Sequence, residues 1–267
     1  MSIRFIILTY RWLIRRPGYM LMTACDDRLA AEPAERFARA WVGLMLFSLL
    51  CGLGLAGLWG LAWKFFPDSD MLLMHSAVTV AAFALWPFRR HVAAMADLLA
   101  GRDTTVRATA AAALVLVLAL CLMRMDTDPI YQGVLAGWAS WLRPDYEFSR
   151  VLVLMPVWGG WSMLITCQFR RPGEGTCPAV AALARGCGAV VTAGGMGVIM
   201  AVTIVYFNFL PWMQLTIPAA TVAAAIIGGL VFCRITGGLS QKALLATNML
   251  TQLVFLMAYL SNRLTAP

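Results

Sequence analysis

Residues 84–107, ALWPFRRHVAAMADLLAGRDTTVR, place four arginines, two aspartates and one histidine between two long apolar runs. The hydrocarbon core of a bilayer is about 30 Å thick, and a helix needs about 20 residues to cross it. The runs on either side of this stretch, 71–88 and 106–123, are close to that length. A charged connector between two such runs predicts a chain that crosses a membrane and returns.

The composition of the whole chain supports this interpretation. Of its 267 residues, 61% are apolar and 13% are charged, and the mean hydropathy is +0.77. Soluble proteins average about 45–50% apolar and about 25% charged residues. Seven stretches are candidates for crossing: 41–63, 71–88, 106–123, 151–169, 187–210, 216–233 and 243–260. The sequence predicts an all-α, polytopic integral membrane bundle of about seven transmembrane helices, with additional interfacial amphipathic helices.

Two regions follow from the position of the first apolar run. Residues 1–40 are predicted to form a cytoplasmic amphipathic segment, and residues 41–267 a transmembrane helical domain. On a helix Arg4, Arg11 and Arg15 share one face, which is typical of a helix lying flat in the headgroup layer. Because Arg11 interrupts the apolar part and no small-residue cleavage site follows, a cleaved secretory signal is not predicted.

Two connectors have the pattern of a helix that lies along a membrane surface. In residues 89–100 four apolar side chains recur at helical spacing: Val92, Met95, Ala96 and Leu99. Arg89, Arg90 and His91 then serve as interfacial anchors. The alternative is that this helix docks a cytoplasmic partner. On the other side of the membrane, residues 130–142 carry a similar stripe with two tryptophans, which prefer the interface.

The basic residues are shared unevenly between the two sides. With a cytoplasmic N-terminus, the inner segments hold sixteen of the 21 lysines and arginines, and these residues are retained on the cytoplasmic side. An odd number of crossings then predicts a cytoplasmic N-terminus and an outer C-terminus, in a bacterial inner (plasma) membrane. The net charge of +8 follows from this asymmetry, so no nucleic-acid partner is indicated.

Small residues spaced four apart let helix backbones approach in lipid. Three predicted spans carry such stripes: Gly52, Ala56 and Gly60; Ala189, Ala193, Gly197 and Ala201; Ala220, Ala224 and Gly228. These stripes predict a tight bundle. Adjacent glycines such as Gly159 and Gly160 have a second interpretation, because they also mark bends near the central cavity of transporters.

None of the thirteen acidic residues lies within the seven predicted spans. A proton-coupled carrier needs an ionisable group in the membrane, and His75 is the candidate for that role. His75 lies about five residues from the outer end of its span, at about 1.5 Å per residue. A hydrogen-bonded histidine in reach of interfacial water is therefore favoured over a ligand or a proton relay.

The last predicted span carries the strongest polar signal inside the membrane. Four of its side chains form one helical stripe: Thr247, Asn248, Thr251 and Gln252. Because amides do not face lipid without partners, the stripe is predicted to point into the bundle or toward another subunit. Asn208 and Gln168 are candidate partners, and interhelical hydrogen bonding is favoured over solute binding.

Acidic residues two apart recur in the predicted outer loops. Asp68 and Asp70 form one pair, and two further pairs are Asp126 with Asp128 and Asp145 with Glu147. Such carboxylates can share a hard divalent cation, provided that six or more oxygens converge. The alternative is that outer loops simply carry solvated charge, some of it paired with Arg143 or Arg150.

The chain contains no GxSxG, HExxH, P-loop or Rossmann signature. Ala184-Arg185-Gly186 resembles the coupling-helix motif of energy-coupling-factor permeases, and nothing further is carried over from that likeness. We expect a noncatalytic, permease-like or scaffolding subunit of a larger membrane assembly, with lipid and other membrane proteins as partners. The alternative is a metal-dependent enzyme that acts on a lipid or isoprenoid at the outer face. Its divalent cation would be held by Asp126, Asp128, Asp145 and Glu147.

Overall fold

The structure is a computed structural model that describes residues 40–65, 71–85, 88–101, 103–125, 147–172, 176, 178–206 and 211–264. Within these residues the regular structure is helical, apart from an isolated bridge between Pro172 and Leu239. The predictions made for residues 1–39 and for the surface helix at 130–142 lie outside the described residues.

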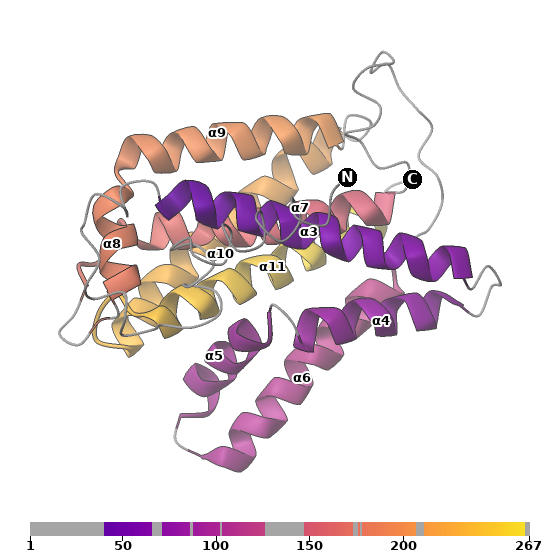
Figure 1. Cartoon of the computed structure of the whole chain (residues 1–267), viewed down its shortest axis with the longest axis horizontal. Coiled ribbons are helices and arrows are strands. Elements are labelled where there is room, and N and C mark those ends of the chain that lie inside the picture. The colour runs from indigo at the N-terminus through magenta and orange to yellow at the C-terminus, as the bar shows by residue number, and fades with distance from the viewer. Residues whose placement is uncertain are drawn as a thin grey trace, which may run out of the picture.

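The described part of the chain forms nine helices (Figure 1). In chain order they are α3 (Ala40–Phe65), α4 (Met71–Leu85), α5 (Arg89–Ala100), α6 (Thr104–Met123), α7 (Glu147–Thr166), α8 (Pro178–Gly186), α9 (Ala189–Tyr206), α10 (Pro211–Ile235) and α11 (Gln241–Leu264). Each of the seven predicted spans contains one apolar helix, which confirms the helical class.

Five of these helices are long and apolar enough to cross a membrane, namely α3, α6, α7, α10 and α11. The apolar parts of the other two are shorter, at Leu73–Ala84 in α4 and Ala189–Ile204 in α9. Length and composition therefore support five crossings and are compatible with an integral membrane protein. The sequence predicts about seven crossings, which is two more than the five that length and composition support.

The helices pack around α7 and α11. The apolar segment of α7 is 89% buried and that of α11 is 72% buried, against 28% for α3, 39% for α10 and 11% for α6. In Figure 1, α3 and α9 flank α7, α10 lies along α11, and α4, α5 and α6 lie below, where α5 packs against α11 and α4 against α3. The two central helices thus make the core, while the outer helices expose their leucines and valines.

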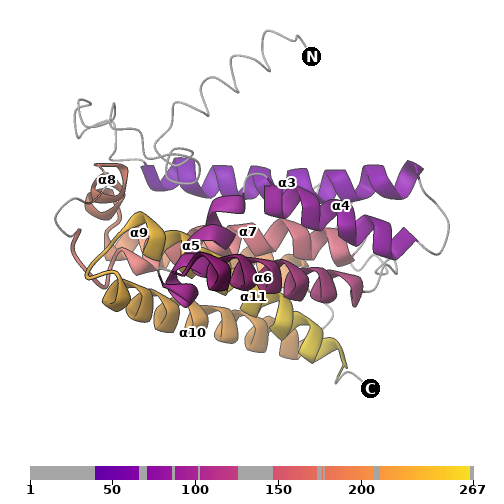
Figure 2. The same ribbon diagram turned by 90° about the horizontal axis from the view of Figure 1, so that it is seen from below.

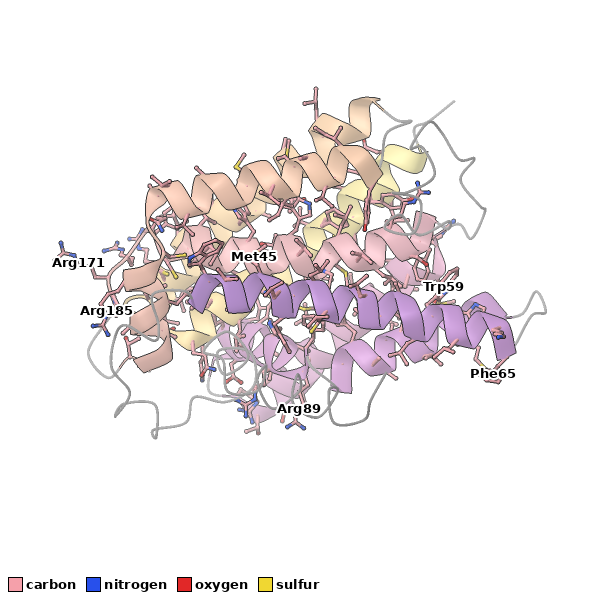
Figure 3. All side chains as sticks on the ribbon, turned by 45° about the horizontal axis from the view of Figure 1, so that its top comes forward. Met45, Trp59, Phe65, Arg89, Arg171 and Arg185 are labelled. Carbon is pink, nitrogen blue, oxygen red and sulfur yellow. The ribbon has the colours of Figure 1, made fainter. Side chains whose placement is uncertain are left out.

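The bundle has two distinct ends. Figure 2 shows the long helices running along a common direction, with α8 at one end. Arg171 and Arg185 lie at this end, which we call the α8 end, and Phe65 lies at the opposite end (Figure 3). The helix α8 lies in the chain between the end of α7, at Thr166, and the start of α9, at Ala189. It therefore connects two antiparallel helices at the same end of the bundle.

The third predicted span, residues 106–123, is extended at its start by a cap. Asp103 is the N-cap of α6, and its carboxylate accepts hydrogen bonds from the backbone N–H groups of Thr105 (2.8 Å) and Val106 (3.2 Å). Such a cap satisfies N–H groups that the first turn leaves unpaired. The helix therefore includes Arg107 and reaches 20 residues.

The helix α5 does not face a membrane surface with its apolar stripe. It packs against α6 and α11, which bury Val92, Met95 and Ala96, while Leu99 stays exposed. His91, which the sequence places among the interfacial anchors, is fully buried, whereas Arg89 is exposed. The amphipathic period is present as predicted, and three of the four residues of the stripe are buried within the protein.

Candidate functional site inside the helical bundle

The polar stripe of α11 faces the interior of the bundle. Thr247, Asn248, Thr251 and Gln252 have no exposed surface. The two threonines donate to backbone carbonyls one turn earlier in α11, at 2.8 Å each. The two amides are therefore the groups available for contacts with other helices.

The amides of α11 interact with each other and with α7. Gln252 Nε2 donates a hydrogen bond to Asn248 Oδ1, and Asn248 Nδ2 lies 3.3 Å from the sulfur of Met163. The remaining oxygen of Gln252, Oε1, is buried without a hydrogen-bond partner among the described residues. The amide–amide hydrogen bond lies within α11, and the contact with Met163 joins α11 to α7. Both are uncharged, so their chemistry is limited to donating and accepting neutral hydrogen bonds.

A glycine on α7 makes room for these amides. A Cβ atom at Gly159 would lie 2.7 Å from Asn248 Oδ1 and 2.8 Å from Gln252 Nε2, and one at Gly160 would clash with Ser48 Oγ on α3. Gly159 thus packs against α11, and Gly160 packs against α3. Since α7 continues as one helix from Glu147 to Thr166, these glycines serve close packing.

His75 lies in an aromatic cluster away from water. Its side chain is fully buried, the Trp59 ring meets it edge-on at 5.9 Å, and the Phe148 ring lies 4.9 Å from that of Trp59. Thr79 donates to the backbone carbonyl of His75 at 2.9 Å. The sequence-based expectation that the imidazole reaches interfacial water is therefore not met.

Three long side chains of α7 hold α9. Arg150 Nη1 donates to the Tyr206 carbonyl at 3.1 Å. Trp158 Nε1 donates to Thr203 Oγ1 at 3.2 Å, and Trp161 Nε1 donates to the Thr192 carbonyl at 3.0 Å. All three donors are at most 1% exposed. Their spacing of eight and eleven residues along a helix is the signal that could have identified them from the sequence.

Of the two proposed partners of the α11 amides, the structure describes Gln168, which has other partners. Gln168, at the α8 end, donates to the Cys187 carbonyl at 2.6 Å and to Thr192 Oγ1 at 3.2 Å. Its amide therefore joins the end of α7 to the start of α9. Asn208 lies outside the described residues.

The acidic pairs of the outer loops are largely outside the described residues. This holds for Asp126, Asp128 and Asp145, and Glu147 opens α7 with a side chain that is not described. Among the residues that the structure describes, no three His, Cys, Asp or Glu side chains are close enough to hold a metal ion. The divalent-cation site therefore stays a prediction from the sequence.

An ionic contact joins α5, α6 and α11. Asp97 pairs with Lys242 at 2.9 Å and with Arg107 at 3.3 Å. The hydrogen bond from Lys242 contributes most to lowering the pKa of Asp97. One turn and a half earlier, burial lowers the pKa of His91 to about 3, against a hydrogen bond with the Phe88 backbone that acts in the opposite direction. His91 is therefore neutral at physiological pH.

Comparison with known proteins finds no matching family model, no matching curated protein and no matching solved structure. The class to which the chain belongs is therefore defined by its own features. These are an all-helical bundle, five helices of membrane-crossing length and a fully buried, uncharged polar contact at its centre.

Proposed function

We propose that this protein is a noncatalytic, permease-like or scaffolding subunit of a larger membrane assembly. It crosses a bacterial inner membrane about seven times, with α4 and α9 crossing as well as the five longer helices. Its N-terminus is cytoplasmic and its C-terminus lies outside. The observation that carries the subunit role is a small-residue stripe on α9 that the described residues leave exposed.

The stripe on α9 consists of Ala189, Ala193, Gly197 and Ala201. All four residues are exposed, and a Cβ atom at Gly197 would meet no other atom within 4 Å. The buried face of α9 lies on the other side of the helix and carries Thr192 and Thr203, which contact α7. Among the residues that the structure describes, no helix lies against this face of α9.

The stripe on α3 and the stripe on α10 are each in contact within the chain at one glycine. A Cβ atom at Gly52 would lie 2.5 Å from the carbonyl oxygen of Val153, and one at Gly228 would lie 2.6 Å from the side chain of Leu250. Gly60, at the other end of the α3 stripe, is exposed, and a Cβ atom there would meet nothing within 4 Å. Small residues of this kind allow close helix contacts, which are the main source of association in lipid. The matching stripe on α9 therefore supports contact with a helix of another chain.

The polar groups at the centre of the bundle support a structural role. The amides of Asn248 and Gln252 contact each other and Met163, and no acidic residue falls within the seven apolar helices beyond the first residue of α7. For the alternative enzyme, the structure adds no specific support, because it describes only the backbone of one of the four proposed metal ligands.

Gly197→Leu tests the proposal. The full-length protein is purified in mild detergent, its mass is measured by light scattering, and copurifying proteins are identified by mass spectrometry. We expect the unaltered chain to purify with a stoichiometric companion or as an oligomer, and the Gly197→Leu variant to purify as a single chain. The added side chain enters open space, so the variant itself should fold.

Gly57→Leu is the matched control. Gly57 is exposed on α3, and a Cβ atom there would also meet no other atom within 4 Å. This variant should keep the companion or the oligomer. If the unaltered protein were not crosslinked to another chain in native membranes, the proposal would be contradicted. An equal loss of assembly in the Gly197→Leu and Gly57→Leu variants would also contradict it.

A further inference from the structure

Three arginines line a pocket at the α8 end of the bundle. The turn that follows α7 contributes Arg170 and Arg171, and α8 contributes Arg185. Figure 3 shows Arg171 and Arg185 close together at this end, beside α8. The pocket has a volume of about 660 Å³, which lies within the range of about 300–1,000 Å³ found for small-molecule sites.

The backbone around this pocket is held from three directions. Gln168 Nε2 donates to the Cys187 carbonyl at 2.6 Å, which ties the turn to the start of α9. The N–H of Leu239, in the turn between α10 and α11, donates to the Arg171 carbonyl at 3.4 Å. Thr176 Oγ1 donates to the Leu239 carbonyl at 3.2 Å. Hydrogen bonds thus hold the backbone that carries the arginines in place.

The charges of these arginines are not neutralised within the described residues. Arg185 Nε donates to the Ala181 carbonyl of its own helix, at 3.3 Å. The ion pairs recorded among the described residues join Asp97 to Lys242 and Arg107 and involve no pocket arginine. The acid nearest to the pocket in the sequence, Glu174, lies outside the described residues. The described part of the pocket therefore carries three positive charges and no acidic side chain.

The walls between the arginines are largely apolar. They include Phe169 and Pro172 from the turn, and Ala181 and Ala184 from α8. The apolar segment of α7 ends at Thr166, directly before this turn. If α7 crosses the membrane, the pocket lies at the depth of the lipid headgroups.

We propose that this pocket binds the phosphate headgroup of an anionic phospholipid. A guanidinium group matches a phosphate through two parallel hydrogen bonds, and basic pockets between membrane helices bind anionic headgroups. The apolar walls accommodate the glycerol and the start of the acyl chains, which a free phosphate lacks. This inference requires that α7 crosses the membrane, and it does not depend on the orientation of the chain or on its role as a subunit.

The test uses the full-length protein in detergent after removal of bound lipid. The probes are dioctanoyl phosphatidylglycerol, dioctanoyl phosphatidylcholine and inorganic phosphate, and binding is followed by native mass spectrometry. We expect phosphatidylglycerol to bind about tenfold more tightly than the zwitterionic lipid or phosphate. Arg171→Gln and Arg185→Gln should each weaken its binding about tenfold, because each removes a charge-assisted hydrogen-bond donor.

Arg234→Gln is the matched control, because Arg234 is exposed in the last turn of α10 and does not line the pocket. It should change the affinity less than about twofold, in keeping with screened surface charge. Glu174→Gln should leave binding unchanged or strengthen it. Ala184→Trp fills the pocket without altering its charge and should abolish binding. This variant tests the pocket independently of the arginine variants.

Three outcomes would overturn the proposal. Equal binding of phosphatidylcholine would mean that charge is not recognised, and equal binding of inorganic phosphate would mean that the ligand is not a lipid. An equal loss in Arg234→Gln and Arg185→Gln would show diffuse attraction to the α8 end and no defined site.

Discussion

Asn248 and Gln252 are buried against Gly159 of α7, a position that has no side chain. The backbone of Gly159 leaves the space that the two amides occupy, so this contact depends on one glycine as much as on the polar groups. In lipid an amide without a partner is unfavourable, since no water is present to satisfy it. The sequence identifies the amides, whereas their partner on α7 is visible only in the folded chain.

Gly159→Ala should destabilise the bundle. The added Cβ would lie 2.7 Å from Asn248 Oδ1, and overpacking of this kind costs about 1–3 kcal/mol. The better helix propensity of alanine offsets at most about 1 kcal/mol. Unfolding in mixed micelles, followed by tryptophan fluorescence, measures the difference. Gly57→Ala is the control, because its Cβ would meet nothing within 4 Å, and a stability loss there as large as at Gly159 would contradict the explanation.

His91 should make the stability of the fold depend on pH between 7 and 5. Burial lowers its pKa from 6.5 to about 3, so the unfolded chain binds the proton first and stability falls as the pH drops below 6.5. At about 1.36 kcal/mol per pH unit, the loss at pH 5 is about 2 kcal/mol.

The variant His91→Phe keeps a ring beside Phe88 and removes the titration, so its unfolding free energy should stay flat from pH 7 to 5. Asp97, whose pKa is lowered from 3.8, contributes stability that is lost only at lower pH. A pH dependence that persists in the variant would assign the effect to another group.

At the scale of helices, α9 is the most weakly joined of the seven apolar helices within the described part of the chain. Its contacts are mainly with α7, through hydrogen bonds donated by Arg150, Trp158 and Trp161. Its other face is exposed, with Val190 at 86% and Val198 at 66%. The opposite holds for α5, whose apolar face is covered by α6 and α11. The hydrophobic period of the sequence predicted both α5 and α9. It did not predict which neighbouring helices cover each face of these two helices.

A double-mutant cycle on Trp158 and Thr203 measures how α9 is held. Trp158→Phe leaves the Thr203 hydroxyl without its donor and should lower stability by more than the roughly 1 kcal/mol of an average hydrogen bond, because ring volume is lost as well. Thr203→Val should also destabilise. Together the two changes should cost less than the sum of the single ones. Additive effects would show that the hydrogen bond is not energetically coupled.

At the scale of the whole molecule, several described basic residues lie at the α8 end. This end carries the three pocket arginines and Lys242, which pairs with Asp97, while α3 ends at the opposite side with Lys64 and the exposed Phe65. Antiparallel neighbours α7 and α9 begin or end at α8. This polarity matches the positive-inside rule if α8 is cytoplasmic.

Reporter fusions test the number of crossings. Fusions truncated after Gly101 and after Gly188 should be fluorescent with a green fluorescent protein reporter and inactive with alkaline phosphatase, because both positions are cytoplasmic with seven crossings. A fusion after Pro267 should give the reverse. Phosphatase activity after Gly101 would mean that α4, whose apolar part is short, does not cross.

The sequence by itself determined the helical class and the positions of the seven apolar helices, because hydrophobicity over about 20 residues is a local property. It also identified the polar stripe on α11. The small-residue stripes on α3, α9 and α10 look alike in the sequence, yet the described residues leave all four positions of the α9 stripe exposed and cover Gly52 and Gly228 of the other two.

Only the tertiary structure decided which faces meet. It placed Gly159 opposite Asn248, buried His91 and Arg150, and gathered arginines from two segments around one pocket. The physical reason is that burial in a bundle depends on neighbours far apart in the chain. Helical period fixes a face, but close packing with a particular partner fixes what that face touches.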